Sequence, residues 1–177
     1  MKQLLLLCAL STFSLVTLAN HEQVIEKPTE GIRNLKMIES TVACAGAITP
    51  DKISGVKDMG FVSIVNLRRS DEEGAMIEEE AAAAKAAGLI YVHIPFSSNE
   101  PDPKAVDEFL AAFSKPGMEP SFIHCAGGSR AAGMWYAKRA ILDGVDIDHA
   151  QEEAKRLGLT SETLQAFMTD YIKAHRK

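Results

Sequence analysis

The sequence predicts an α/β fold with a mainly parallel central sheet flanked by helices. Short segments rich in β-branched residues alternate with helix-forming segments from residue 42 onwards, as in proteins with β-α-β units. The 177 residues, 46% of them hydrophobic and 24% charged, can bury one core and are too few for two ordinary ones. We therefore expect a single globular domain.

The first 19 residues have the pattern of a secretory signal peptide. Lys2 precedes an apolar run over residues 4–18, and small residues close the segment at Ala19. The run is shorter than the roughly 20 apolar residues that span a bilayer, and hydroxyl residues interrupt it. We expect cleavage and export, with no stable membrane insertion afterwards. Residues 20–41 are predicted to be an extended N-terminal lead-in, and residues 42–177 the domain.

The strands and helices are predicted from apolar periodicity and from the glycine, proline and polar residues that end each segment. Buried strands are expected at 42–47, 61–67, 89–94 and 121–124, because these segments are apolar and end at polar, glycine or proline residues. Helices are expected at 50–60, 75–87, 103–113, 130–142, 148–157 and 161–175. Thr49 and Asp102 each precede a proline, the pattern of an N-cap followed by proline in the first turn.

Polar or small residues follow three of these strands. In open parallel sheets, ligands bind at the carboxyl ends of the strands. The loops after Leu67 and Ile94 and the segment that begins at Cys125 are therefore expected to converge on one crevice.

Charge and ligand-type residues narrow the function classes. The formal net charge is −5, and it becomes about −6 once the single lysine of the leader is removed. This disfavours general nucleic-acid binding, which depends on basic surfaces. The histidines are scattered without metal-site spacing, so no metal is expected. Cys44 and Cys125 remain in the mature chain, and the sequence leaves open whether they form a disulfide.

The segment FIHCAGGSR, residues 122–130, places a cysteine where a strand gives way to a helix. The small residues Ala126, Gly127, Gly128 and Ser129 allow backbone N–H groups to turn inward, and a helix start attracts anions. Such a site favours the thiolate of Cys125. Arg130 offers a planar guanidinium suited to phosphate oxygens, and His124 would lie behind the loop. The alternative is a buried strand-end cysteine with an arginine on the surface.

The order of the motifs resembles a known family. HCAGGSR, followed by AAGMWYAKRAI and preceded by GAITPDKISGVKDMGFVSIVNLR, DEEG and AAGLIYVHIPF, resembles the cysteine-dependent, dual-specificity-like protein tyrosine phosphatases. Within them it looks like the bacterial beta-lactamase-hydrolase-like phosphatase domain, over residues 42–142.

The resemblance implies a two-step hydrolysis of phosphate monoesters. The substrate would be a phosphorylated protein or a phosphorylated small molecule. Cys125 would attack phosphorus while the Arg130 guanidinium and the amides of residues 126–130 hold the equatorial oxygens. Water would then cleave the phosphocysteine, and no metal or cofactor is implied.

Two departures from the family keep alternatives open. Four residues separate Cys125 from Arg130, where tyrosine phosphatases usually have five. Four is also the spacing of many rhodanese-like sulfurtransferases, whose cysteine carries a persulfide, and a non-catalytic anion-binding module is a further alternative. The hydroxyl residue that commonly follows the arginine is Ala131 here, and Ser129 is a candidate substitute.

The general acid has two candidates. Asp102 lies in the region where the family keeps its acid, and it is equally suited to cap a helix. Asp71, in the charged loop RRSDEEG, is the second candidate, with an ordinary solvated loop as its alternative. We expect Arg68 to be exposed and His93 to be a hydrogen-bonded core histidine. Trp135 and Tyr136 are expected to pack in the core.

Overall fold

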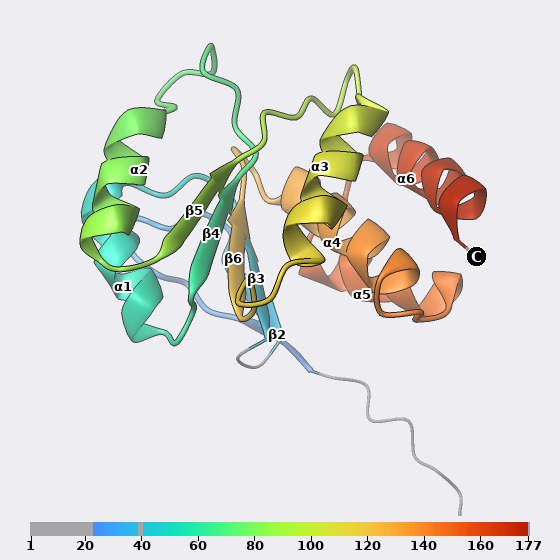
Figure 1. Ribbon diagram of the computed structural model, residues 1–177, viewed down its shortest axis with the longest axis horizontal. Coiled ribbons are helices and arrows are strands. Elements are labelled where there is room, and N and C mark those ends of the chain that lie inside the picture. The colour runs from blue at the N-terminus through green and yellow to red at the C-terminus, as the bar shows by residue number, and fades with distance from the viewer. Residues whose placement is uncertain (1–22, 39–40, 177) are drawn as a thin grey trace, which may run out of the picture.

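The computed structural model describes residues 23–38 and 41–176, and the predicted signal peptide lies outside them. One six-stranded sheet forms the centre of this part of the chain, in the order β1-β2-β3-β6-β4-β5 (Figure 1). Strands β3, β6, β4 and β5 are parallel, whereas β2 is antiparallel to both β1 and β3. The strands are β1 (Val24–Glu26), β2 (Lys36–Ile38), β3 (Val42–Ala45), β4 (Ser63–Asn66), β5 (Ile90–His93) and β6 (Ser121–His124). The predicted mainly parallel sheet is confirmed.

Helices cover both faces of the sheet (Figure 1). On one face lie α1 (Ile53–Asp58), which follows the short 3-10 turn η1 (Pro50–Lys52), and α2 (Ile77–Ala86). On the other face lie α3 (Pro103–Phe113), α4 (Ser129–Ile141), α5 (Ile147–Leu157) and α6 (Glu162–His175). No helix within the described residues is long and apolar enough to cross a membrane.

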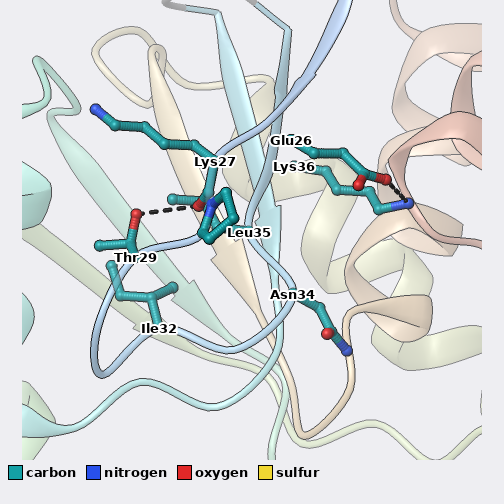
Figure 2. A pocket seen from close by; sticks show the side chains of 8 residues that line it. Glu26, Lys27, Thr29, Ile32, Asn34, Leu35 and Lys36 are labelled. Carbon is teal, nitrogen blue, oxygen red and sulfur yellow. Dashed lines mark hydrogen bonds and ion pairs between the residues drawn. The ribbon is translucent and has the colours of Figure 1, made fainter.

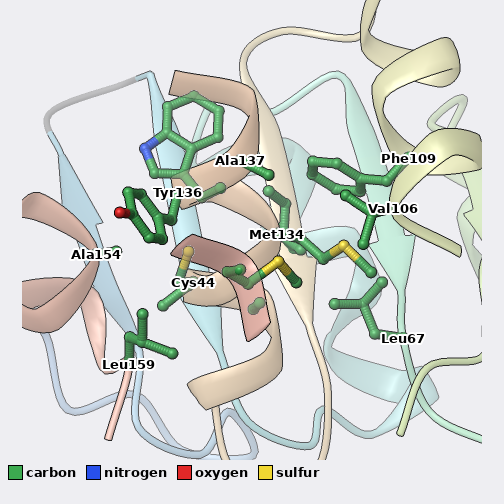
Figure 3. Close-up of a cluster of buried hydrophobic side chains, with 14 of the residues drawn as sticks. Cys44, Leu67, Val106, Phe109, Met134, Tyr136, Ala137, Ala154 and Leu159 are labelled. Atoms are coloured by element: carbon green, nitrogen blue, oxygen red, sulfur yellow. The ribbon is translucent and has the colours of Figure 1, made fainter. Parts of the chain in front are cut away.

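Alternation along the strands divides the core into two clusters. Successive strand residues point to opposite faces, so Ile64 and Phe122 pack towards α1 and α2 while Val65 and Ile123 pack towards the other helices. Figure 3 shows the larger cluster, built between the sheet and helices α3 to α6. As expected, Trp135 and Tyr136 are buried in it.

The lead-in contributes more to the domain than its sequence suggests. Strands β1 and β2 lie within residues 20–41 and extend the sheet beyond β3. The ion pair between Lys36 Nζ and Glu26 Oε1, at 2.7 Å, joins the two strands. Each strand has three residues, too short for a period-2 pattern to reveal.

The helix starts follow the capping signals in part. Asp102 caps α3, because its carboxylate accepts a hydrogen bond from Lys104 N at 2.9 Å. Thr49 has the extended backbone of an N-cap, but its side chain makes no capping hydrogen bond to η1.

Candidate active site

The cysteine loop begins where β6 ends in the middle of the sheet. Cys125 N donates to Ala45 O of β3 at 3.2 Å, and the side chain is 1% exposed. Gly128 N donates to Cys125 Sγ at 3.1 Å. Gly128 has φ +105°, which L side chains rarely adopt, whereas Gly127 has no positive φ. The predicted need for glycine conformations is therefore confirmed for Gly128 alone.

The loop offers several backbone donors to an anion. Within the described residues, the N–H groups of Ala126, Gly127, Ser129 and Arg130 make no hydrogen bond. Two of these groups belong to the first turn of α4, where a helix provides no internal acceptor. The dipole of α4 adds partial positive charge at the same end. The loop thus has the donors that an oxyanion needs.

Arg130 binds the carboxyl ends of two further strands. Its Nη1 donates to Leu67 O after β4 at 3.1 Å and to Phe96 O after β5 at 2.6 Å. Its Nη1 and Nη2 also contact the Glu72 carboxylate, at 2.6 and 2.8 Å. The predicted convergence of the three loops is confirmed by these contacts.

The contacts to oxygen atoms leave one edge of the guanidinium without an oxygen partner among the described residues. Glu72 occupies the end formed by Nη1 and Nη2, and the two carbonyls share Nη1. Arg130 has five N–H donors, and within the described residues Nε donates to no oxygen. The edge formed by Nε–H and the second Nη2–H can bind two oxygens of a phosphate side by side.

Glu72 is ionised at neutral pH and holds Arg130 in place. Burial would raise the pKa of its carboxyl, but hydrogen bonds from Arg130, Arg69 N and Arg68 outweigh that effect and lower the pKa to about 2. The pKa of Arg130 is itself raised: burial acts to lower it, but hydrogen bonding to Glu72 and Cys125 and the charges of both groups raise it. Both groups therefore stay charged.

The expectation that Arg68 is exposed is wrong. Arg68 is 4% exposed and donates to Gly74 O at 2.6 Å, to Glu73 O at 2.5 Å and to Glu72 Oε2 at 3.4 Å. The loop after β4 folds back over this side chain, a tertiary feature that the charged sequence does not reveal. Arg68 thereby fixes the loop that presents Glu72 to Arg130.

The two acid candidates differ in their surroundings. Asp102 is exposed and serves as the cap of α3, which is one of its two predicted uses. Asp71 is also exposed and pairs with Arg69, with Arg69 Nε 3.0 Å from Asp71 Oδ1. Asp71 therefore lies in an ordinary solvated charged loop, which was the alternative to its acid role. A carboxyl that caps a helix can still donate a proton, so the acid role of Asp102 stays a prediction.

Three further polar side chains around the loop have defined partners. Ser129 Oγ accepts hydrogen bonds from Thr160 N and Ser161 N, at 3.1 and 3.3 Å, and so joins the loop to the start of α6. His124 is fully buried behind the loop, with Nε2 3.2 Å from Glu80 Oε2. The His93 ring is hydrogen-bonded as expected, to Arg68 O at 2.7 Å, but it is half-buried on the edge strand β5 and does not lie in the core.

Cys44 and Cys125 are both free and buried. Cys44 lies in β3, in register with Ile123, and shares the larger core cluster with Cys125. Burial raises the pKa of the Cys44 thiol well above its usual range, and the charges of Cys125 and Glu153 raise it further. Cys44 is therefore a protonated core residue at neutral pH, and Cys125 is the cysteine placed for chemistry.

The sequence interpretation missed two residues that shape the site, Glu72 and Asn34. Glu72 lies in the acidic stretch after β4, and a carboxylate at the carboxyl end of a strand is the available signal for it. Asn34 donates from Nδ2 to Gly127 O at 3.0 Å, although 93 positions separate the two residues. No local pattern could indicate that contact.

A strand-end cysteine, a ring of amide donors and an arginine clamp on a mainly parallel sheet define a cysteine-dependent, phosphatase-like protein. A family model agrees: the beta-lactamase hydrolase-like protein, phosphatase-like domain, matches residues 34–142. The chain belongs to this family. A beta-lactamase hydrolase-like protein of Xylella fastidiosa is 32% identical over 112 residues, 60% of this chain and 25% of that protein. One from Agrobacterium fabrum is 38% identical over 90 residues, 48% of this chain and 20% of that protein. The chain thus spans about a quarter or less of these relatives.

Solved structures share the fold at low identity. A DUF442 protein from Shewanella putrefaciens CN-32 has a TM-score of 0.68 and 22% identity, covering 83% of this chain and 96% of that chain. TpbA of P. aeruginosa has a TM-score of 0.63 and 17% identity, covering 88% of this chain and 91% of that chain. These similarities support the phosphatase-like fold and give no support to the sulfurtransferase alternative.

Proposed function

We propose that the protein hydrolyses phosphate monoesters through a phosphocysteine at Cys125. The observation that carries this proposal is the joint arrangement of Cys125 Sγ, the unpaired loop amides and the Nε edge of Arg130, which contacts no oxygen of the described residues. All three belong to one loop, so one phosphate group can meet them together.

The proposed reaction has two steps. The Cys125 thiolate forms a bond to phosphorus as the bond to the leaving oxygen breaks, and Asp102 supplies the proton that this oxygen takes up. Water then attacks the phosphocysteine, which releases inorganic phosphate and restores the thiolate; Asp102 receives the proton of the water. The loop amides and Arg130 stabilise the equatorial oxygens in both steps.

The direct test is the variant Cys125→Ser, assayed with an aryl phosphate. We expect hydrolysis to be abolished, because a serine hydroxyl is a far poorer nucleophile than a thiolate. Cys44→Ser is the matched control and should retain turnover. Undiminished hydrolysis by Cys125→Ser would reject the mechanism. Formation of a Cys125 persulfide from thiosulfate, without phosphate release from the ester, would instead favour sulfur transfer.

The proposed substrates are phosphorylated proteins or small molecules. TpbA, which shares the fold, has been solved as a cysteine-to-serine variant in complex with phosphotyrosine, which supports a phosphorylated substrate. A panel of phosphopeptides, nucleotides and sugar phosphates would rank the substrate classes by kcat/KM.

We also propose that the protein is exported after removal of residues 1–19. The support is the pattern of Lys2, an apolar run and a small residue at position 19. Cell fractionation followed by sequencing of the mature N-terminus tests this proposal. A mature chain that still begins at Met1 would contradict it.

A further inference from the structure

One side chain outside the cysteine loop donates a hydrogen bond to a peptide group within it. Asn34 lies in the turn before β2, next to a pocket of about 340 Å³ (Figure 2). Figure 2 shows its amide extending from the pocket towards the loop that precedes α4. There Asn34 Nδ2 donates to Gly127 O at 3.0 Å.

The geometry of a trans peptide makes this contact relevant to the chemistry. Gly127 O and Gly128 N–H belong to the same planar unit and point in opposite directions, since this peptide bond is trans. With the oxygen held by Asn34, the N–H points away from it, and it donates to Cys125 Sγ at 3.1 Å.

The preceding peptide group is held in the same way, by backbone. Ala126 O accepts from Ala47 N at 3.1 Å, which directs Gly127 N–H away from β3. Gly46 allows this approach, because a Cβ at that position would lie 2.8 Å from Ala126 O. Gly127 and Gly46 are paired in an isolated antiparallel bridge, so the loop is held against the end of β3 while Gly128 N–H donates to Cys125 Sγ.

The backbone of Asn34 supports a positioning role. Its φ is +49°, and among the described non-glycine residues it alone has a positive φ. Both neighbours are fixed by backbone hydrogen bonds, Arg33 N to Ala47 O at 2.9 Å and Lys27 N to Leu35 O at 3.2 Å. Asparagine tolerates this left-handed conformation better than most residues do. The amide is therefore presented to the loop by a rigid turn.

We propose that Asn34 is a positioning residue for the cysteine loop, acting through Gly127 O to aim Gly128 N–H at the sulfur of Cys125. The inference rests on the proposed nucleophilic role of Cys125. In this proposal, a side chain of the N-terminal segment helps to stabilise the Cys125 thiolate. The thiolate is the attacking group of the first step and the leaving group of the second.

Two substitutions at Asn34 separate the hydrogen bond from the backbone conformation. Asn34→Gly keeps the positive φ accessible and removes the donor, whereas Asn34→Asp keeps the shape and places an acceptor against Gly127 O. Lys36→Met is the matched control, because it breaks the ion pair to Glu26 beside the same pocket and leaves the contact to the loop intact.

The readouts are the turnover of p-nitrophenyl phosphate and the pH profile of Cys125 alkylation by iodoacetamide, mapped by mass spectrometry. We expect Asn34→Gly to lower kcat about three- to tenfold, the effect of one hydrogen bond, and to move half-maximal alkylation to higher pH. Asn34→Asp should have a larger effect in both readouts. Lys36→Met should match the wild type in both.

The alkylation profile keeps this inference separate from the proposed function, because it needs no turnover. If the wild type hydrolyses no phosphate ester, the function fails while alkylation still decides the role of Asn34. Only variants that circular dichroism shows to be folded are assayed. If Asn34→Gly does not fold, the result for Asn34→Asp tests the proposal. Wild-type profiles in both variants, or an equal shift in Lys36→Met, would show a merely structural residue and overturn the proposal.

Discussion

Replacing Glu72 by glutamine removes a charge from the partly buried contact with Arg130. Because Glu72 has a lowered pKa in the folded protein, it stabilises the fold above its ordinary pKa of 4.5, and this contribution is lost as the pH falls towards about 2. At 1.36 kcal/mol for each pKa unit, the difference corresponds to about 3 kcal/mol. Solvent screening of this partly exposed carboxylate reduces that figure, so Glu72→Gln should lower the free energy of unfolding by about 1–3 kcal/mol at pH 7.

The pH dependence distinguishes this ion pair from a packing effect. Urea unfolding at pH 7, 5, 4 and 3 should show a constant gap between wild type and Glu72→Gln down to about pH 5, and a narrowing gap below it. Asp71→Asn is the control, because Asp71 is exposed in the same loop and should change stability little. A gap that is absent at pH 7, or that does not narrow in acid, would refute the electrostatic account.

Three further predictions concern the loop and its surroundings. Gly128→Ala should cost about 1–2 kcal/mol of stability in chemical denaturation and reduce turnover at least tenfold, because the φ of Gly128 is +105°. Gly127→Ala should fold normally, because a Cβ at that position meets open space. Equal effects of the two substitutions would contradict this assignment. Asp102→Asn should keep the cap and the melting temperature but slow hydrolysis of alkyl phosphates more than of p-nitrophenyl phosphate, because the better leaving group needs less protonation; equal slowing would argue against an acid role. Iodoacetamide at pH 7 should modify Cys125 and spare Cys44, whose pKa is raised by burial, and peptide mapping that finds Cys44 modified first would be inconsistent with the structure.

Much of the fold could be predicted from local patterns. The predicted helix at 103–113 matches α3 residue for residue, and the strand at 121–124 matches β6. In both places, alternating or helical apolar spacing coincides with a strong end signal, such as Asp102-Pro103 before α3. Strands β1 and β2 were not predicted, because three residues are too few to display a period-2 pattern. These two strands are defined mainly by their pairing with neighbouring strands.

The site was predicted in part, for a related reason. Cys125, the glycine pair and Arg130 are neighbours in the chain, so their joint chemistry can be derived from six adjacent positions. Glu72 comes from another loop, and its partnership with Arg130 depends on β4 lying beside β6. Arg68 was expected in solvent because charged residues usually are, and the fold of its loop decided otherwise.

The sequence by itself determined the chemistry within one loop: a cysteine at a strand end, flexible residues after it and an arginine at the start of a helix. Only the tertiary structure decided what surrounds that loop, namely Glu72, Leu67 O and Phe96 O on Arg130 and Asn34 on Gly127. The physical reason is that backbone propensities and apolar periodicity act over a few residues. Contacts between distant segments depend on which strands become neighbours, and burial of the whole chain selects that order.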